Sequence, residues 1–410
     1  MKKIIHMLFL AVSCAAIFGS CQTHYIDIPK IAADPRGEII SATLVQTLDT
    51  AQIRQKLISN GVSSLAFITL NYSIAFYKVV YKTIDFDGNA TIASGAVMLP
   101  KGTPKPQGIA SYQHGTVILK EDVPSRMNKE SLIGMVLSSS LGLNMCSADY
   151  LGLGDSPGMH PYIVAKAEAN ACVDMIRATK KVAATNGQTI NGQLFLFGYS
   201  EGGHATMALL KELEEKYATE LPVTAAAPMA GPYDVSGYQT NVIVSNSPYP
   251  SPFYLPYILF GYNSVYKMYP SANDFLKTPF NQTLPPLFDG LHSSNSINTA
   301  MGGSNVIPNT IIRPEVLDAF RYNYQHPLRK ALRDNDLYDW KPKTPMMLCH
   351  CSGDDQVDYR NTQVAYNTFL ANGVNPANLK MMNPGNLTHG NCALPCLLDA
   401  LDFVTGFMAL

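Results

Sequence analysis

The sequence carries little charge and no excess of either sign. Only 15% of its 410 residues are charged, and 30 Lys and Arg stand against 31 Asp and Glu. This balance gives no basic field to attract phosphates, which argues against a nucleic-acid-binding protein. A disordered chain is excluded as well, because 47% of the residues are hydrophobic and the net charge is only −1.

Long hydrophobic runs are also lacking after the N-terminus. No second run of eighteen or more apolar residues follows the first, which excludes a membrane protein with several spans. The chain is long enough to bury one large core, or to form one domain with a large insertion. We therefore expect a soluble globular protein.

The N-terminus has the pattern of a signal peptide over residues 1–20. Two lysines precede the apolar stretch 4–18, and two small residues then precede Cys21. The pattern resembles a bacterial lipobox, in which the cysteine is lipidated after cleavage, although Phe18 stands where leucine is usual. We expect a lipid anchor at Cys21 on a bacterial membrane, within the cell envelope. The alternative is ordinary secretion.

Six cysteines remain in the rest of the chain. In an oxidising compartment an even number permits disulfides, but the sequence does not reveal their pairing. Cys349-His350-Cys351 is not accompanied by a second ligand pair at zinc spacing, so we expect no metal. The six are Cys146, Cys172, Cys349, Cys351, Cys392 and Cys396.

Most of the chain alternates between short apolar runs and amphipathic stretches. After a lead-in over 21–74 with a helix near 50–58, residues 75–100 read as strands joined by an Asp87-Gly88 hairpin. The later alternation predicts an α/β fold with a mostly parallel sheet covered by helices on both faces. The expected strands are 108–112, 143–149, 193–198, 223–229, 345–350 and 378–382, and the expected helices are 131–141, 163–184, 202–217, 360–371 and 397–410.

This rhythm is interrupted between residues 235 and 343. The interruption is too long for a simple loop, and prolines and tyrosines crowd between residues 248 and 286. We expect an inserted cap subdomain at 235–343. The hydrolase core would then consist of 75–234 and 344–410.

The segment Gly198-Tyr199-Ser200-Glu201-Gly202 matches the pattern G-x-S-x-G. An apolar strand is expected before it and a helix after it, which is the setting that a nucleophilic serine on a sharp turn requires. Ser200 is therefore the candidate nucleophile. The alternative is a glycine-rich turn with an inert serine.

A nucleophilic serine needs a base and an acid that orients the base. Asp354 directly follows the expected strand 345–350 and is the preferred acid. Asp355 and Asp358 are the competitors, and any of the three could instead cap a turn or helix.

His389 is the preferred base, because it follows the acid in the chain and precedes a terminal helix. We expect it in a flexible loop over 388–392. His350 is expected to pack within its strand, and His204 to pack within its helix.

A loop after the first parallel strand supplies one oxyanion donor in this architecture. We expect the backbone N–H of Thr116 in that role, beside the N–H of Glu201, with Gly115 allowing close approach and His114 acting structurally. The glycine loop 149–156 is not a nucleotide site, because Pro157 stands where a third glycine is needed. No cofactor is expected.

Together these motifs resemble the α/β-hydrolase superfamily, and within it most closely the secretory lipase (lipase A-like) group. The resemblance covers roughly residues 75–410 and implies a Ser200–Asp354–His389 triad with an oxyanion hole at Thr116 and Glu201. The cap sequence does not resemble the fungal lipase lid. The segments that carry the resemblance are Tyr-Gln-His-Gly-Thr, Asp-Tyr-Leu-Gly-Leu-Gly-Asp-Ser, His-Pro-Tyr, Gly-Tyr-Ser-Glu-Gly-Gly-His, Ser-Gly-Asp-Asp-Gln-Val and Thr-His-Gly.

The expected function is that of a serine hydrolase that cleaves carboxylic esters through an acyl-enzyme. Its substrate would be a small-molecule, lipid or carbohydrate ester, and the only membrane attachment would be the N-terminal lipid. Two alternatives remain open at this point. One is a serine peptidase of the same fold, and the other is a catalytically silent homologue that binds partners at the surface.

Overall fold

The computed structural model describes residues 35–409. The signal peptide and the lipidation site expected at Cys21 lie outside the described residues. Within 35–409, no helix is both long and apolar enough to cross a membrane.

A single nine-stranded sheet runs through the protein, with the strand order β1-β2-β3-β5-β4-β6-β7-β8-β9. The first three strands pair antiparallel, as do β3 and β5, and every pairing from β5 to β9 is parallel. The strands are β1 Ile39–Leu48, β2 Ser73–Ile84, β3 Ala90–Lys101, β4 Gln107–Gln113, β5 Asn144–Ala148, β6 Ile190–Tyr199, β7 Ala225–Met229, β8 Met346–Cys349 and β9 Leu379–Met382.

The central strands β4, β5 and β7 are buried along their whole length because both faces of the sheet are covered. In β6, Leu194 and Leu196 point into one hydrophobic cluster and Phe195 and Phe197 into the other. This explains why the sequence shows a continuous apolar run here rather than an alternation of apolar and polar residues.

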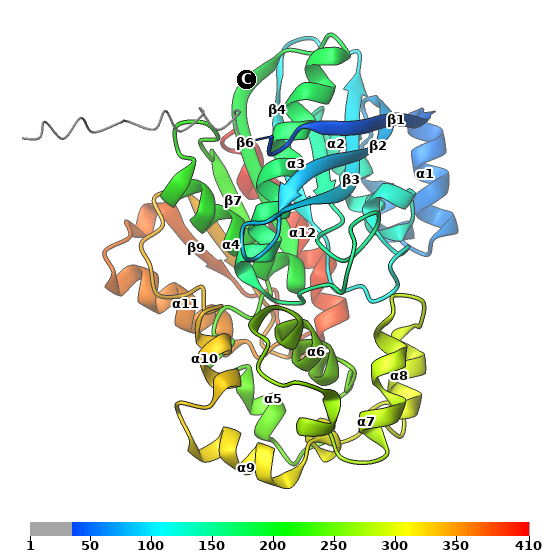
Figure 1. Ribbon diagram of the computed structural model, residues 1–410. Coiled ribbons are helices and arrows are strands. Elements are labelled where there is room, and N and C mark those ends of the chain that lie inside the picture. Colours follow the sequence, from blue (N-terminus) through cyan, green and yellow to red (C-terminus); the bar gives the residue numbers. More distant parts are fainter. Residues whose placement is uncertain (1–34, 410) are drawn as a thin grey trace, which may run out of the picture. The chain divides into compact units, whose positions relative to one another are not determined.

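Helices cover both faces of the sheet, as expected (Figure 1). The face that carries Leu194 is packed by α3 Ala165–Thr185, α4 Glu201–Lys216 and α11 Arg360–Ala371. The opposite face is packed by α1 Thr50–Ser59, α2 Leu132–Leu141 and α12 His389–Thr405.

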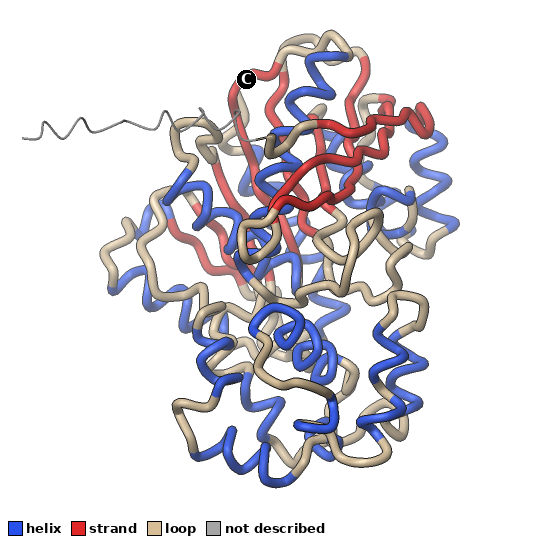
Figure 2. Tube along the Cα trace, in the orientation of Figure 1, coloured by secondary structure: helices blue, strands red, loops and turns tan. Residues whose placement is uncertain are grey.

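Between β7 and β8 the chain forms a group of short helices, which we call the helical insertion (residues 235–343). Figure 2 shows this part of the molecule as helices and loops beside the strand-containing part. No described residue of the insertion belongs to a strand of the sheet. Its α-helices are α5 Thr240–Val244, α6 Tyr254–Tyr266, α7 Phe280–Thr283, α8 Ser294–Ala300, α9 Pro314–Tyr322 and α10 Pro327–Arg333.

Short 3₁₀ turns complete the connections. They are η1 Ser63–Phe67, η2 Pro124–Arg126, η3 Lys129–Ser131, η4 Ala272–Asp274, η5 Pro285–Phe288, η6 Pro308–Ile311 and η7 Pro376–Asn378.

Two features differ from the sequence prediction. The lead-in contains an edge strand, β1, that the sequence analysis did not predict. Only Leu48 of its ten residues is buried, so the strand lacks the apolar alternation that marks a half-buried strand. The terminal helix α12 begins at His389 and not at residue 397, and it continues through Pro395.

Candidate active site

Ser200 lies at the sharp turn between β6 and α4. Its backbone has φ 63° and ψ −126°, a strained conformation for a residue with a side chain. The neighbouring glycines are required by space: a Cβ on Gly202 would lie 2.0 Å from the carbonyl oxygen of Gln113. A Cβ on Gly203 would lie 2.2 Å from the carbonyl oxygen of Met229. The glycines of the sequence motif therefore let the turn pass between two neighbouring strands.

His389 lies within hydrogen-bond distance of Ser200, although 189 residues separate them in sequence. The distance from His389 Nε2 to Ser200 Oγ is 2.8 Å. The imidazole is only 6% exposed, and the hydroxyl of Tyr199 donates to the His389 carbonyl oxygen at 2.5 Å. Both the ring and the backbone of His389 are thus held beside the serine.

The prediction that His389 lies in a flexible loop is wrong, because His389 is the first residue of α12. Its backbone N–H donates to Asp355 Oδ1 at 3.0 Å, so an acidic side chain lies at the helix N-terminus, where it is favourable. Cys392 and Cys396, in the next two turns, form disulfides with Cys351 and Cys349 respectively. These bonds hold the helical turns on either side of Pro395 against the end of β8.

The structure distinguishes between the three candidate acids. Asp354 Oδ2 accepts from His389 Nδ1 at 2.6 Å. Asp355 contacts the backbone of the same histidine, as described above. Asp358 lies outside this group and pairs with Arg360. Only Asp354 is therefore placed to orient the imidazole.

The Asp354 carboxylate is fully buried and accepts hydrogen bonds on both oxygens. The backbone N–H groups of Gln356 and Val357 donate to Oδ1 at 2.9 and 2.8 Å. Burial by itself raises the pKa of Asp354, but the hydrogen bonds and charges of His350 and His389 outweigh it and hold the pKa below its ordinary value. The carboxylate is therefore ionised at neutral pH.

The two expected oxyanion donors lie on either side of Ser200. Glu201 is the first residue of α4, so its N–H belongs to the helical turn that lacks intrahelical acceptors. A Cβ on Gly115, next to Thr116, would lie 4.0 Å from Ser200 Cβ, which places this loop against the serine. The Thr116 side chain is 3.0 Å from the hydroxyl of Tyr162.

Glu201 also has a buried side-chain partner that the sequence analysis did not identify. Its Oε1 lies 2.7 Å from His160 Nε2, and both side chains are almost fully buried. Burial lowers the pKa of His160, but the Glu201 charge outweighs this and raises it. The His-Pro-Tyr segment, quoted above only for the resemblance, thus supports the residue that follows the serine.

The histidines that were expected to be structural do contact the core. His114 Nδ1 lies 2.8 Å from the Gly115 carbonyl oxygen, and His204 Nδ1 lies 2.7 Å from Glu168 Oε2. His350 differs from the expectation, because it lies just after β8 and not within it, and its Nε2 lies 3.1 Å from Asp354 Oδ2. No local spacing could reveal this contact, since it depends on the path of the loop after β8.

A small cavity of about 40 Å³ lies beside Ser200. Its lining comes from the turn after β6, from the loops after β5, β7 and β8, and from the helical insertion. It is mostly apolar, with Val242, Leu255 and Ile258 among its residues. A wider groove of about 400 Å³ adjoins it and shares Tyr249 and Gln356. The groove is lined largely by Ser, Asn and Asp side chains.

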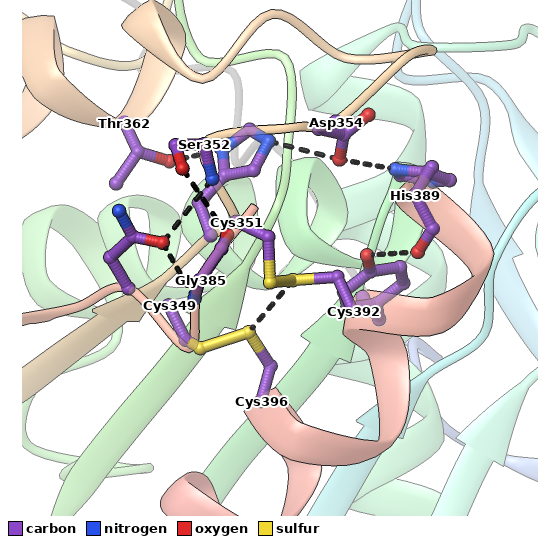
Figure 3. Close-up of a disulfide and its surroundings, with 12 residues drawn as sticks. Cys349, Cys351, Ser352, Asp354, Thr362, Gly385, His389, Cys392 and Cys396 are labelled. Carbon is purple, nitrogen blue, oxygen red and sulfur yellow. Dashed lines mark hydrogen bonds and ion pairs between the residues drawn. A yellow bond between two sulfur atoms is a disulfide. The ribbon is translucent and has the colours of Figure 1, made fainter. Parts of the chain in front are cut away.

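One group of potential metal ligands occurs within the described range, and it consists of Cys351, Cys392 and Cys396. All three sulfurs are engaged in the two disulfides. Figure 3 shows these disulfides beside Asp354 and His389. In this state the sulfurs are not thiolates, which are the form that binds metals.

Comparison with solved structures identifies the class of protein. A protein from Legionella pneumophila assigned as a hydrolase is 29% identical, with a TM-score of 0.83, over 90% of this chain and 98% of its own. The rice cell wall degrading esterase LipA from Xanthomonas oryzae is 25% identical, with a TM-score of 0.79, over 91% and 97%. The chain has the α/β-hydrolase fold, and it is a carboxylic-ester hydrolase.

The family follows from the sequence. The family model for secretory lipases matches residues 129–398, about two thirds of the chain, and the protein belongs to this family. The family description indicates a secreted protein. Candida antarctica lipase A in its closed state shares the fold at 18% identity and a TM-score of 0.66, over 90% of this chain and 81% of its own. No curated protein sequence matches the chain.

Proposed function

We propose that the protein cleaves carboxylic esters through a Ser200–His389–Asp354 triad and an acyl-enzyme intermediate. The observation that carries this proposal is the continuous hydrogen-bond chain from Ser200 Oγ to His389 Nε2 at 2.8 Å, and from His389 Nδ1 to Asp354 Oδ2 at 2.6 Å. The strained turn that presents Ser200 gives independent support, because strain of this kind is typical of nucleophilic serines in this fold.

In the first half of the reaction, Ser200 Oγ attacks the ester carbonyl carbon while His389 Nε2 takes the hydroxyl proton. The negative charge that develops on the carbonyl oxygen is stabilised by the backbone N–H groups of Glu201 and Thr116. The tetrahedral intermediate collapses when His389 returns the proton to the departing alcohol. Ser200 then carries the acyl group, and Asp354 has stabilised the imidazolium throughout.

In the second half, His389 Nε2 takes a proton from water, and the hydroxide oxygen attacks the acyl carbon. The resulting tetrahedral intermediate uses the same N–H donors. Its collapse releases the carboxylic acid, and His389 protonates Ser200 Oγ again. Ester and water are thereby converted to acid and alcohol with no other reactant.

We propose a short acyl group and a polar alcohol portion for the substrate, which would be a small-molecule, lipid or carbohydrate ester. The apolar cavity beside Ser200 has only about 40 Å³, so a long acyl chain requires the helical insertion to move. The adjoining groove, about 400 Å³ in volume, offers hydroxyl, amide and carboxylate groups to an alcohol portion that carries hydroxyls. The Xanthomonas oryzae relative, which degrades the rice cell wall, agrees with a polar substrate.

The sequence-based expectation of a lipidated Cys21 is kept as part of the proposal. A secreted esterase with an N-terminal lipid would act at the bacterial cell envelope. Incorporation of a labelled fatty acid into the full chain, and its loss in Cys21→Ala, tests this location separately from activity.

The activity is tested with a short p-nitrophenyl ester and the variant Ser200→Ala. We expect turnover to fall by about 10⁴-fold or more, because the nucleophile is lost while the fold is kept. Ser59→Ala, an exposed change in α1, is the matched control and should hydrolyse the ester at the wild-type rate. Retained turnover in a folded Ser200→Ala protein would contradict the proposal.

A further inference from the structure

The carboxylate of Asp354 contacts two imidazoles, and the proposed mechanism uses only one of them. Oδ2 lies 2.6 Å from His389 Nδ1 and 3.1 Å from His350 Nε2. Figure 3 shows Asp354 between the side chain of His389 and the region of Thr362. A second histidine on the acid requires an explanation, because a buried imidazole is costly unless both ring nitrogens are satisfied.

His350 is held on both of its ring nitrogens and is fully buried. Its Nδ1 lies 2.7 Å from Thr362 Oγ1 in α11, and its Nε2 is also 3.1 Å from the Val357 carbonyl oxygen. When the Thr362 hydroxyl donates to Nδ1, the ring proton is on Nε2 and points to Asp354. Asp354 Oδ2 and the Val357 carbonyl oxygen are both acceptors, so the contacts of Nε2 favour this tautomer, and the two oxygens share its proton.

The neighbours of His350 fix its backbone as well. Cys349 and Cys351 flank it in sequence, and their disulfides to Cys396 and Cys392 tie this segment to α12. Because side chains alternate along an extended segment, the two sulfurs point to the α12 side while the imidazole points to the α11 side. His350 is thus held between the helix that carries His389 and the helix that carries Thr362.

We propose that His350 is a positioning residue for ester hydrolysis, which holds Asp354 Oδ2 toward His389 and shares the negative charge of the carboxylate. This inference rests on the proposed triad. The backbone N–H groups of Gln356 and Val357 fix Oδ1, whereas Oδ2 is held only by the two imidazoles, one of which is the proposed base itself. The donor from His350 fixes the second oxygen and with it the plane of the carboxylate.

Few other groups near Asp354 could hold its carboxylate and share its charge as His350 does. Burial raises the pKa of three tyrosines near Asp354, so they remain neutral, and Asp355 is directed to the backbone of His389. The removal of the His350 donor would therefore affect mainly His389. The titratable groups that face Asp354 or His350 from the surrounding elements are His389, Asp355, Asp358, Tyr199, Tyr249, Tyr254 and Tyr359.

The removal of His350 has a predictable sign. Without its donor, more negative charge on Oδ2 is directed at His389, which stabilises the imidazolium form of that residue. The base must be neutral to accept the serine proton. The acidic limb of the kcat/KM profile should therefore move to higher pH, while the looser carboxylate lowers kcat at the plateau.

The test compares His350→Phe with Thr362→Val, using a short p-nitrophenyl ester between pH 5 and 9. His350→Phe keeps a ring but loses the donor, and we expect kcat to fall about tenfold to a hundredfold with little change in KM. The midpoint of the acidic limb of the kcat/KM profile should move to higher pH by about half a unit or more. Thr362→Val removes only the hydroxyl that bonds to Nδ1 of His350. It should lower kcat and raise the pH of the acidic limb, both by smaller amounts than His350→Phe. His350→Gln, which restores an N–H donor, should recover part of kcat.

Wild-type values of kcat and of the acidic limb in folded His350→Phe would overturn the inference. A drop in activity that only follows the loss of folded protein, measured by thermal unfolding, would overturn it as well. If His350→Phe does not fold, Thr362→Val decides the question by the same two quantities. Absence of ester hydrolysis by the wild-type protein would instead contradict the proposed function, so the two failures are distinguishable.

Discussion

The three segments that carry Ser200, Asp354 and His389 are held very differently from the helical insertion that covers them. Near the triad, the chain is fixed by a strained turn, by backbone hydrogen bonds to Asp354 and by two disulfides. The insertion contains no cysteine and pairs with no strand of the sheet. The two regions meet within one cavity but are constrained to different degrees.

Tyrosine hydroxyls make much of the polar contact between the insertion and the core. Tyr249 donates to the Gln356 carbonyl oxygen at 2.8 Å, and Tyr257 donates to the Val117 carbonyl oxygen at 2.9 Å. Each such hydrogen bond contributes only about 1 kcal/mol net. We therefore expect that the core determines the chemistry, and that the insertion limits the size of the substrate and tolerates substitutions that leave the chemistry intact.

The largest effect should come from a change in the rigid region. Asp354→Asn keeps the size of the side chain but removes the charge that orients His389, and we expect kcat to fall by about 10³- to 10⁴-fold on a short ester. Asp358→Asn is the matched comparison among the candidate acids and should lower kcat far less, because Asp358 is bonded to Arg360 whereas Asp354 is bonded to His389. Equal activity of the two variants would remove the distinction between the candidate acids.

The disulfides test whether covalent ties maintain the difference between the regions. The double variant Cys351→Ser/Cys392→Ser loses the disulfide between two residues that are 41 apart in sequence. We expect its free energy of unfolding to fall by about 2–5 kcal/mol. Activity should also fall at temperatures where the protein remains folded, because α12 carries His389. Differential scanning calorimetry and initial rates measure the two effects. Cys146→Ala, which removes an unpaired thiol, is the control, and an equal loss of activity there would argue against a specific role for the link.

A change in the insertion should alter the choice of substrate more than the rate. Ile258→Ala enlarges the apolar cavity beside Ser200, so the ratio of hexanoyl to acetyl ester hydrolysis should rise about 5- to 150-fold, which corresponds to about 1–3 kcal/mol of discrimination. Val265→Ala, on the same helix but outside the cavity lining, should leave that ratio unchanged. A panel of p-nitrophenyl esters measures it, and identical profiles for both variants would contradict the proposed acyl site.

The smallest predicted effect concerns a buried acid that joins the two ends of the insertion. Asp336 accepts from the backbone N–H and the hydroxyl of Ser236 at 2.8 and 2.6 Å. Burial raises its pKa to about 6, so the folded state binds its proton more tightly than the unfolded state does. Its contribution to stability is therefore fully present below pH 4 and is lost as the pH rises through about 6.

Above pH 6 the charged carboxylate of Asp336 destabilises the folded state relative to its protonated form. Asp336→Asn should remove this destabilisation, because an amide can still accept from the N–H group and donate to the hydroxyl of Ser236. We expect the Tm at pH 8 to rise by about 2 °C relative to wild type, and the gain to shrink at pH 4. A Tm difference that does not vary with pH would show that the charge on Asp336 is not the cause.

The parts of the site that the sequence predicted are those encoded by local patterns. Ser200 stands in a five-residue motif between a strand and a helix, so the motif alone located it. Asp354 lies in the loop after β8, and the sequence pattern narrowed the acid to three aspartates of which it was preferred. The contact of His350 with Asp354 and the pairing of the cysteines depend on how distant segments fold together. The sequence carries no local signal for them.

The errors in the predicted fold have the same origin. The small residues at 388–392 suggested a flexible loop, whereas the bond to Asp355 and the Cys351–Cys392 disulfide hold the segment in α12. Strand β1 was missed because its residues are mostly exposed at the edge of the sheet. In both cases pairing with a distant segment outweighed the local propensity.

The account depends most directly on the identity of the nucleophile. Treatment with a fluorophosphonate, followed by intact mass measurement and peptide mapping, identifies the residue that attacks. We predict one adduct per chain, located on Ser200, with its formation abolished in Ser200→Ala and strongly slowed in Asp354→Asn. Labelling at another residue, or no labelling of a folded wild-type protein, would contradict the proposed mechanism.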